Sequence, residues 1–319
     1  MMKRIEIMNK QQRKDGVTAR LFPVVKDYLG NHLTTIDEIK QGVWMVHSKK
    51  EKWILKEFRT KQQLFLQHKL TRYLKEYGFT QTYQFMPIQF VIDHRTIGCI
   101  EYIPSLKNRS FHYRTRQNIF DAFSLIQQFH TTTRQFSHKF PELSLFNQME
   151  KWHNRFSHYK NWFQLSPMRT NIFLKAMVDY GEWALEQLGT TNDLLLPSTD
   201  CLIHGDVAHH NFIRAEDGQL HLIDFDLVKS GSETIDYLQL ANRVLPYLDW
   251  DIDMLFQIPE LNKYKKNEQF LIALTYPTDV YRECLLYRGH HTNQLLSLFR
   301  LPKKRLKFYE TIKARYDKR

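Results

Sequence analysis

The sequence CLIHGDVAHHNFIRAEDGQLHLIDFD, residues 201–226, decides the fold of this 319-residue chain. Three short apolar runs in it are separated by polar residues, and residues 216–219 (EDGQ) between the last two runs are a turn signal. This pattern predicts a strand, a polar loop, a second strand, a turn and a third strand, which ends at the acidic pair Asp224 and Asp226.

The polar residues of this stretch are the groups that phosphoryl transfer requires. Asp206 is followed five residues later by Asn211, and Asp224 stands a further thirteen residues on. A carboxylate can orient or deprotonate an acceptor hydroxyl, and carboxylate and amide oxygens are hard ligands for the Mg²⁺ that neutralises phosphates. We therefore predict Asp206 as the catalytic base and Asn211 and Asp224 as metal ligands. A simple strand-end cap at Asp224 would not explain the ordered spacing.

Four histidines in the same region raise a zinc site as an alternative. His204, His209, His210 and His221 accompany Asp206, and His and carboxylate side chains are common zinc ligands. No Cys pair and no H-E-x-x-H motif is present, and zinc sites usually show such spacing. The sequence therefore favours phosphoryl transfer.

The run HGDxxxxN followed by IDFD resembles the aminoglycoside phosphotransferase and choline kinase branch of the protein-kinase-like fold, which has Asp-x-Asp where protein kinases have Asp-Phe-Gly. The resemblance spans residues 34–290 and implies an α+β fold of two lobes. Residues 1–103 would form a helical lead-in, a nucleotide-binding lobe with a small antiparallel sheet, and a hinge. Residues 104–319 would form a mostly helical lobe with the catalytic loop and the acceptor site.

The same resemblance implies the chemistry. We expect an ATP- or GTP-dependent phosphotransferase that acts, with Mg²⁺, on a hydroxyl of a small molecule, with nucleotide and metal in the cleft. Asp226 would be an auxiliary metal ligand or active-site acid, and His204 would support the catalytic loop. Sugars, amino alcohols, antibiotics and proteins all present such a hydroxyl, so the class of acceptor stays open.

Three strand-like runs open the N-terminal lobe: residues 34–40, 43–48 and 51–58. Gly42 stands at the first junction, where the related folds have the glycine loop that covers nucleotide phosphates. Lys56 follows the apolar triplet WIL, as the phosphate-binding lysine follows V-A-I in kinases. We assign Gly42 and Lys56 to the nucleotide site.

Residues 61–77 have the apolar spacing of an amphipathic helix. The related folds carry a glutamate here that pairs with the strand lysine, but no acidic residue occurs before the last two positions of this helix. Gln63 and Gln67 are the polar candidates, and Glu57 adjoins the lysine. A glutamine can hold an ammonium group by hydrogen bonding, but without charge assistance. This departure puts full catalytic competence in question.

Two further strand-like runs, residues 85–92 and 96–102, lead to the expected hinge between the lobes. In the related fold, the backbone of this segment receives the adenine ring. We assign Glu101, Tyr102 and Ile103 to the nucleotide site on this basis.

Helical periodicity continues in three segments: residues 115–136, 145–163 and 168–188. His130 lies in an apolar helical setting, so we interpret it as a core histidine and not as a ligand. Residues 229–233 are expected to form a loop before another helix. In kinase-like folds an Asp at the position of Asp236 braces the catalytic loop, and we assign it that structural role.

The segment DWDID, residues 249–253, borders the acceptor pocket if the resemblance holds. Asp249, Trp250 and Asp253 are our candidates for acceptor contacts, since carboxylates and a Trp ring can hold a cation. Acidic residues are also favoured at the start of a helix, and that alternative, which needs no ligand, is the one the sequence favours.

Residues 270–277 and the helix through Tyr287 resemble the bacterial spore-coat proteins of the S and I type, a subgroup of the same superfamily. They share an alanine/leucine helix, an aromatic-Pro step and a Tyr-rich helix. A second hypothesis follows: a spore-coat or scaffold protein with little catalysis, whose partners are other spore-coat proteins and whose location is the spore coat.

Composition sets the outer limits. Hydrophobic residues make up 42% of the chain, with 11 Gly and 10 Pro, which is typical of a compact folded protein. Cys99, Cys201 and Cys284 are far apart and fit a reducing compartment. The opening residues MMKR lead into polar sequence, so we expect no signal peptide, and no apolar run reaches the ~18 residues of a membrane helix. We predict a cytoplasmic protein without a membrane span.

The formal net charge is +12, and many of the basic residues lie near the two ends of the chain. Such ends can bind nucleic acid, anionic lipid or an acidic protein. No nucleic-acid motif accompanies the charge, so we do not predict nucleic-acid binding, and solvated helix faces are the simpler interpretation.

Overall fold

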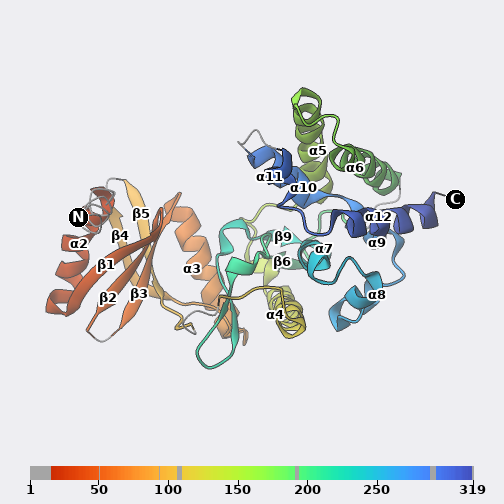
Figure 1. The fold of residues 1–319 in the computed structure, drawn as a ribbon. Coiled ribbons are helices and arrows are strands. Elements are labelled where there is room, and N and C mark those ends of the chain that lie inside the picture. The colour runs from red at the N-terminus through yellow and green to blue at the C-terminus, as the bar shows by residue number, and fades with distance from the viewer. Residues whose placement is uncertain are drawn as a thin grey trace. The chain divides into compact units, whose positions relative to one another are not determined.

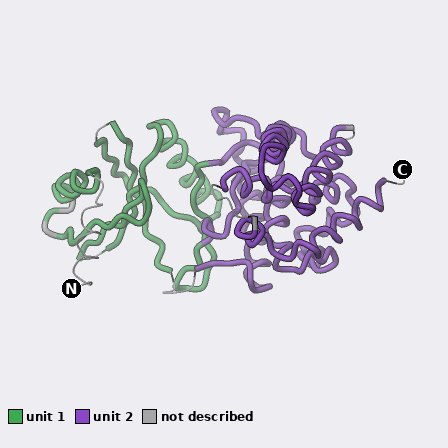
Figure 2. The backbone as a smooth tube through the Cα atoms, turned by 45° about the horizontal axis from the view of Figure 1, so that its top comes forward, with its two compact units in different colours: residues 1–109, 213–226 green, residues 110–212, 227–319 purple. Residues whose placement is uncertain are grey.

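The computed structural model describes residues 16–49, 51–92, 94–105, 110–190, 194–287 and 292–317. The chain divides into two compact units, coloured separately in Figure 2: unit 1 is Met1–Arg109 with Ile213–Asp226, and unit 2 is Ser110–Phe212 with Leu227–Arg319. The two units differ from the expected lobes, residues 1–103 and 104–319, because residues 213–226 from the middle of the sequence belong to unit 1. The first fifteen residues of the expected helical lead-in lie outside the described residues.

Unit 1 is built on an antiparallel sheet of five strands (Figure 1). In spatial order these are β1 (Leu33–Lys40), β2 (Val43–Ser48), β3 (Lys52–Phe58), β5 (Arg95–Glu101) and β4 (Phe85–Ile92). Each bound lies within one residue of the expected strand-like runs. The antiparallel sheet, together with the mostly helical remainder of the chain, confirms the expected α+β fold class.

Two helices cover the two faces of this sheet: α2 (Gly16–Leu29) and α3 (Lys61–Glu76) (Figure 1). On the α2 face the buried Trp44 of β2 donates a hydrogen bond from Nε1 to the Thr18 hydroxyl at 2.9 Å. This bond satisfies the one polar atom of a large buried side chain, so α2 is fixed to the sheet by both packing and hydrogen bonding.

The α3 face is where the chemistry of unit 1 lies. Gly98 of β5 lets α3 approach closely, since a Cβ atom at that position would stand 2.6 Å from Cδ1 of Leu64. Lys56 of β3 pairs with Gly98 across the ladder. Directly paired residues point to the same face of a sheet, so Lys56 projects toward α3.

The segment Ile213–Asp226 packs with unit 1 and carries most of a hairpin between β7 (Phe212–Arg214) and β8 (Leu220–Leu222), then the turn η4 (Phe225–Leu227). Backbone interactions join it to the rest of unit 1: Glu216 N–H to Pro104 carbonyl at 2.9 Å, Leu222 N–H to Gln81 carbonyl at 2.9 Å, and a bridge between Ser105 and Ala215. Asp224 and Asp226 are therefore carried by unit 1.

Unit 2 is mostly helical, as expected. Its helices are α4 (Arg116–Arg134), α5 (Gln148–Leu165), α6 (Ile172–Thr190), α7 (Thr234–Val244), α8 (Ile252–Leu255), α9 (Glu268–Thr275), α10 (Thr278–Leu286), α11 (Thr292–Leu296) and α12 (Pro302–Tyr316). The expected starts near residues 61 and 115 are confirmed by side-chain caps, because the hydroxyls of Thr60 and Thr115 accept backbone N–H groups of the first turns of α3 and α4. In the part of the chain that the structure describes, no helix has the length and apolar character needed to cross a membrane.

One strand contradicts the expectation from sequence. Residues 229–233 were expected to be a loop, but Lys229–Gly231 forms strand β9, which pairs antiparallel with β6 (Cys201–Ile203). The expectation was wrong for these three residues because a strand so short shows no alternation of apolar and polar positions. The pairing ties the start of the catalytic loop to the segment that follows Asp226.

The C-terminal helix α12 is held by a buried arginine. Arg305 donates hydrogen bonds to the two carboxylate oxygens of Asp279 at 2.9 Å and 2.5 Å, and one from Nε to the Tyr309 hydroxyl at 2.9 Å. Its guanidinium carbon lies 4.6 Å from the ring centroid of Trp250. Burial alone would raise the pKa of Asp279, but the Arg305 guanidinium outweighs that effect and the pKa lies below its usual value.

We predict that Arg305→Met lowers the free energy of unfolding of unit 2 by about 3 kcal/mol, because it leaves the Asp279 carboxylate without its counter-ion. The measurement is the shift in the denaturant midpoint. Because the pKa of Asp279 is lowered in the folded protein, this stabilisation is present at neutral pH. It is lost as the pH falls from the ordinary carboxylate range through the lowered pKa of Asp279.

The control for this variant is Lys307→Met, an exposed position on the same helix, which should change stability by less than ~0.5 kcal/mol. Removing both charges in Arg305→Met/Asp279→Leu should recover part of the loss. If Arg305→Met unfolds at the same midpoint as Lys307→Met, the pair does not hold α12.

Candidate functional site

Asp206 lies in the loop between β6 and β7, within unit 2. Arg243 of α7 donates a hydrogen bond from Nη2 to Asp206 Oδ1 at 2.8 Å. Asn211 donates from Nδ2 to the Asp206 backbone carbonyl at 2.8 Å. The amide nitrogen of Asn211 therefore faces the loop, and no hydrogen bond among the described residues engages its Oδ1. That oxygen remains available to a hard cation.

The loop is braced from below by Asp236, which is fully buried. Its carboxylate accepts the backbone N–H groups of His204 at 2.7 Å and Gly205 at 2.9 Å, and it bonds His130 Nε2 at 2.9 Å. Burial alone would raise the pKa of Asp236, but the hydrogen bond and charge of His130 outweigh it, so the pKa is lowered. The expected bracing role of Asp236 and the core position of His130 are both confirmed.

Gly205 makes this arrangement sterically feasible. It has φ = +78°, and a Cβ atom there would lie 2.5 Å from the backbone oxygen of Leu227. Only glycine fits both conditions. The neighbouring His204 is buried, and its Nδ1 accepts the Asp206 N–H at 3.3 Å, so His204 lies where a support for the loop is needed.

Three of the expected site residues in unit 1 form an ion cluster. Lys56, whose side chain is 14% exposed, donates from Nζ to Asp224 Oδ1 at 2.6 Å and to Asp226 Oδ1 at 2.8 Å. Asp224 adopts φ = +70°, a left-handed conformation that few residues other than glycine, Asn and Asp tolerate. The structure thus brings these three residues together from positions about 170 apart in the sequence.

Helix α3 contacts this ion cluster through glutamines. Gln67, 1% exposed, donates from Nε2 to Asp226 Oδ1 at 2.6 Å, and Gln63 donates to the same oxygen at 3.3 Å. The orientation of the Gln67 amide is fixed, because Tyr83 donates its hydroxyl to Gln67 Oε1 at 3.1 Å. Asp224 and Asp226 therefore supply the carboxylates that pair with Lys56, and α3 supplies hydrogen bonds that hold Asp226.

This arrangement explains the glutamine at position 67. A glutamate there would lie against Asp226, and two carboxylates at that distance repel each other in a buried setting. Glu57, the other candidate partner of the lysine, forms an ion pair with Arg95 at 3.2 Å instead.

Lys56 and Asp224 also line a cavity of about 300 Å³ within unit 1. The expected hinge residues Glu101, Tyr102 and Ile103 belong to the same wall. Most of the remaining wall is aliphatic: Ile39, Val43, Met45, Ile54, Ile100, Ile213 and Ile223. Apolar walls with a few polar groups at one end are typical of sites for a planar ring that carries a charged substituent.

Gly42 does not itself line this cavity. It occupies the turn between β1 and β2 with φ = +76°, and its near neighbours Lys40 and Val43 line the cavity. The expected contribution of Gly42 is thus the turn that places these two residues.

The donor groups of the expected metal site fit Mg²⁺. Asn211 of unit 2 and Asp224 of unit 1 carry amide and carboxylate oxygens, which are the donors that Mg²⁺ prefers. The zinc alternative needs three or more His, Cys, Asp or Glu side chains close together, and the described residues contain no such group.

None of the three candidate acceptor residues lines the cavity of unit 1. Trp250 has φ = +59° and is 4% exposed, and its ring already packs against the Arg305 cation. Asp249 forms an exposed ion pair with Lys304 at 2.9 Å. Asp253 follows Asp251, which caps α8 through two backbone N–H groups, so the helix-start interpretation of this segment is confirmed for Asp251.

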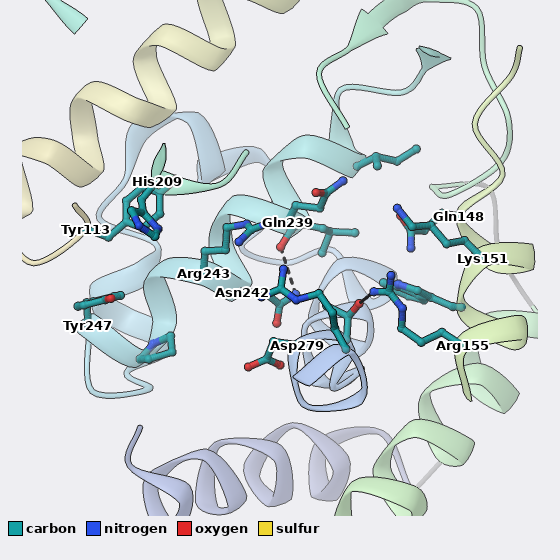
Figure 3. Close-up of a pocket in the computed structure, with 16 residues that line it drawn as sticks. Tyr113, Gln148, Lys151, Arg155, His209, Gln239, Asn242, Arg243, Tyr247 and Asp279 are labelled. Carbon is teal, nitrogen blue, oxygen red and sulfur yellow. Dashed lines mark hydrogen bonds between the residues drawn. The ribbon is translucent and has the colours of Figure 1, made fainter. Parts of the chain in front are cut away.

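A second cavity, of about 240 Å³, lies in unit 2 and none of those three residues lines it. Side chains of α5, α7 and α10 form most of its wall, together with Tyr113, His209 and Tyr247 (Figure 3). Arg243, the partner of Asp206, is part of the wall. We did not anticipate Arg243, although it follows Asp236 by seven residues, a spacing that puts both on one side of α7.

Residues 38–253 match a family model described as the phosphotransferase enzyme family. This chain belongs to that family. The match covers the sheet, the catalytic loop and the Asp-x-Asp segment, which confirms the resemblance to aminoglycoside phosphotransferases. It does not show the spore-coat subgroup.

Solved structures of the family share the fold. An aminoglycoside phosphotransferase from Alicyclobacillus acidocaldarius superposes with a TM-score of 0.69 at 14% identity, over 90% of this chain and 94% of the other. A putative aminoglycoside phosphotransferase from Ralstonia eutropha gives 0.54 at 11%, over 92% and 98%. Spectinomycin phosphotransferase APH(9)-Ia gives 0.53 at 14%, over 93% and 94%. A comparison with curated proteins gave no match.

The Lys56 cluster generates a prediction specific to this family member. Asp226→Asn should lower phosphotransferase turnover at least tenfold, because Lys56 loses one of its two carboxylates, and Gln67→Glu alone should also lower it through repulsion of Asp226. The double variant Asp226→Asn/Gln67→Glu should recover part of the activity, because it returns one carboxylate to the cluster. Steady-state kinetics with varied nucleotide measure all three.

Glu57→Gln is the matched control, because Glu57 adjoins Lys56 in sequence but pairs with Arg95. It should leave the kinetics unchanged. Additive losses in the double variant would show that Gln67 and Asp226 do not act on the same lysine.

Proposed function

We propose that this member of the phosphotransferase family transfers the γ-phosphoryl group of ATP or GTP, with Mg²⁺, to a hydroxyl group of a small molecule. The observation that carries the proposal is Lys56 paired with Asp224 at 2.6 Å in the wall of an aliphatic cavity, in a chain whose loop presents Asp206 beside Asn211. These groups can bind phosphates, hold a metal and accept a proton.

The nucleotide is assigned to the cavity of unit 1. Its base would lie against the aliphatic wall and meet the backbone of residues 101–103, and Lys56 would contact the phosphates. Asp226 would keep the ammonium of Lys56 in place, a role in which Gln67 and Gln63 assist by hydrogen bonding. The spectinomycin phosphotransferase of similar fold was crystallised with ADP, which supports nucleotide use.

The proton transfer is assigned to Asp206. The acceptor oxygen forms a bond to the γ-phosphorus, the bond from that phosphorus to the β–γ bridging oxygen breaks, and the nucleoside diphosphate leaves with the electron pair. The acceptor proton passes to an oxygen of Asp206 and then to solvent. Arg243 donates to Oδ1 of Asp206 at 2.8 Å and Asn211 donates to Oδ2 at the longer distance of 3.3 Å, so both contacts orient the carboxylate, and we assign the proton transfer to the more weakly held Oδ2.

Asn211 and Asp224 would hold Mg²⁺. When bound, the ion neutralises charge on the phosphates that develops as the leaving group departs. The contribution of the chain is to keep the two ligands in fixed conformations, through the Asp206 carbonyl for Asn211 and through Lys56 for Asp224.

The scaffold alternative rested on the missing helix glutamate. Asp226 supplies a carboxylate to Lys56, so that departure no longer speaks against catalysis. Nothing in the family match or the similar structures points to a spore coat, and the proposal therefore remains an enzyme.

We predict that Asp206→Asn lowers turnover by roughly 10²–10⁴-fold while the fold is retained, because the loop loses its proton acceptor but keeps a side chain of the same shape. Nucleotide turnover measured in the presence of an acceptor panel tests this. Asp217→Asn, an exposed turn position, is the control and should be active. An Asp206→Asn variant as active as that control would refute the role of Asp206.

We predict that Mg²⁺ and ATP or GTP together raise the thermal stability of the wild type. Binding at ~100 times the dissociation constant should add about 2.7 kcal/mol. Asp224→Ala should lose the metal-dependent part of this stabilisation, whereas Asp217→Asn should retain it. A thermal-shift titration makes the measurement, and absence of any shift with either nucleotide would contradict the nucleotide site.

A further inference from the structure

The cavity of unit 2 is strongly basic. Four cationic side chains line it, namely Lys151, Arg155, Arg243 and Arg282, against a single carboxylate among the described lining residues, Asp279. That carboxylate is already engaged by the two hydrogen bonds from Arg305. The cavity therefore presents positive charge to whatever enters it.

Two of the four cations have no ionic partner in the part of the chain that the structure describes. Arg243 pairs with Asp206 and Arg282 with Glu283. Among the described residues, no carboxylate forms an ion pair with Lys151 or Arg155; Arg155 donates to the Thr278 hydroxyl at 2.7 Å, and Lys151 lies 4.8 Å from the ring centroid of Phe146. Figure 3 shows both side chains on the same side of the cavity, on successive turns of α5.

Holding these two cations together is unfavourable without an anion. Burial lowers the pKa of Lys151 to about 8, with Arg155 the largest charge contribution, and burial also lowers the pKa of Arg155. An anion bound between them would remove the repulsion and accept charge-assisted hydrogen bonds from both. The site is thus preorganised for a negative group.

Arg243 links this cavity to the proposed catalytic base. Arg243 belongs to its wall and holds Asp206 Oδ1, and the Asp206 charge is near enough to act on the pKa of Lys151. A small molecule with an anionic group at Lys151 and Arg155 can therefore direct a hydroxyl toward Asp206. A cationic acceptor would meet like charges in the same place.

We propose that the phosphoryl acceptor of this protein is a small hydroxylated molecule with a carboxylate or phosphate group, which Lys151 and Arg155 bind. That the bound molecule is a phosphoryl acceptor rests on the proposed phosphotransferase function. Anion binding by Lys151 and Arg155 can be tested without any nucleotide.

The test uses four compounds that share one diol: glycerate, glycerol 3-phosphate, glycerol and 3-aminopropane-1,2-diol. Isothermal titration of the full chain, at fixed ionic strength and without nucleotide, should show at least one anion binding tenfold or more tightly than glycerol, and the amine binding most weakly. The ratio between glycerate and glycerol 3-phosphate distinguishes a carboxylate site from a phosphate site.

Lys151→Gln and Arg155→Gln should each weaken binding of the preferred anion about tenfold, because that is the usual contribution of a charge-assisted hydrogen bond. Neither variant should change the affinity for glycerol. Lys175→Gln removes one exposed positive charge on α6, away from the cavity, and is the matched control. Lys151→Arg should retain the affinity.

Affinity for the preferred anion should also fall between pH 7 and pH 9, because Lys151 loses its proton near pH 8. The charged groups that act on it are Arg155 on its own helix, Lys229 on β9, Asp206 on the loop and Asp236 on α7. Lys151→Arg should abolish this decline, an effect that a purely structural role would not produce.

Equal affinity for the four compounds, lack of binding by both anions, or anion binding that survives Lys151→Gln and Arg155→Gln would overturn the inference. Turnover separates it from the proposed function. Phosphoryl transfer to the amine but not to the anions would leave the function standing and refute the anionic acceptor. Anion binding as described, with no transfer to any hydroxyl, would leave the anion site standing and refute the proposed function.

Discussion

The arrangement of unit 1 depends on one buried cation. Lys56 projects from the sheet into the space under α3, where its ammonium needs negative partners in a poorly solvated place. Its two carboxylate partners are Asp224 and Asp226, from a segment that follows the loop of Asp206 in sequence. These ion pairs add to the backbone hydrogen bonds of Glu216 and Leu222 that hold the same segment in unit 1.

Unit 2 contains a buried anion, which is likewise stabilised by groups from other segments of the chain. Asp236 is a buried carboxylate, and its partners are two backbone N–H groups of the loop and one imidazole. Because the two backbone donors belong to His204 and Gly205, their hydrogen bonds to the carboxylate also fix the conformation of the loop that carries Asp206. In both units a buried ionic group fixes the conformation of the site residues that surround it.

Much of this could be predicted from local sequence. Strands β2 and β4 follow from mostly apolar runs bounded by turn signals, and the Asp206–Asn211 spacing identifies the loop because both residues lie on one short segment. The pairing of Asp226 with Lys56 could not be predicted, since it joins residues 170 positions apart. Strand β9 is too short for a pattern, and the left-handed backbone at Trp250 turns into the core a side chain that the sequence alone made a candidate for binding.

The distribution of charge in unit 2 does not favour a cationic acceptor. A Trp beside acidic residues is a natural receptor for a cationic acceptor, but here Trp250 packs on Arg305 and Asp249 pairs with Lys304. The basic C-terminal helix thus occupies the groups that a cationic ligand would need. Among the described residues, no carboxylate forms an ion pair with Lys151 or Arg155 of the cavity wall. Part of the positive charge is therefore neutralised where it supports the fold, and the charge of these two side chains is the part that an anionic ligand would balance.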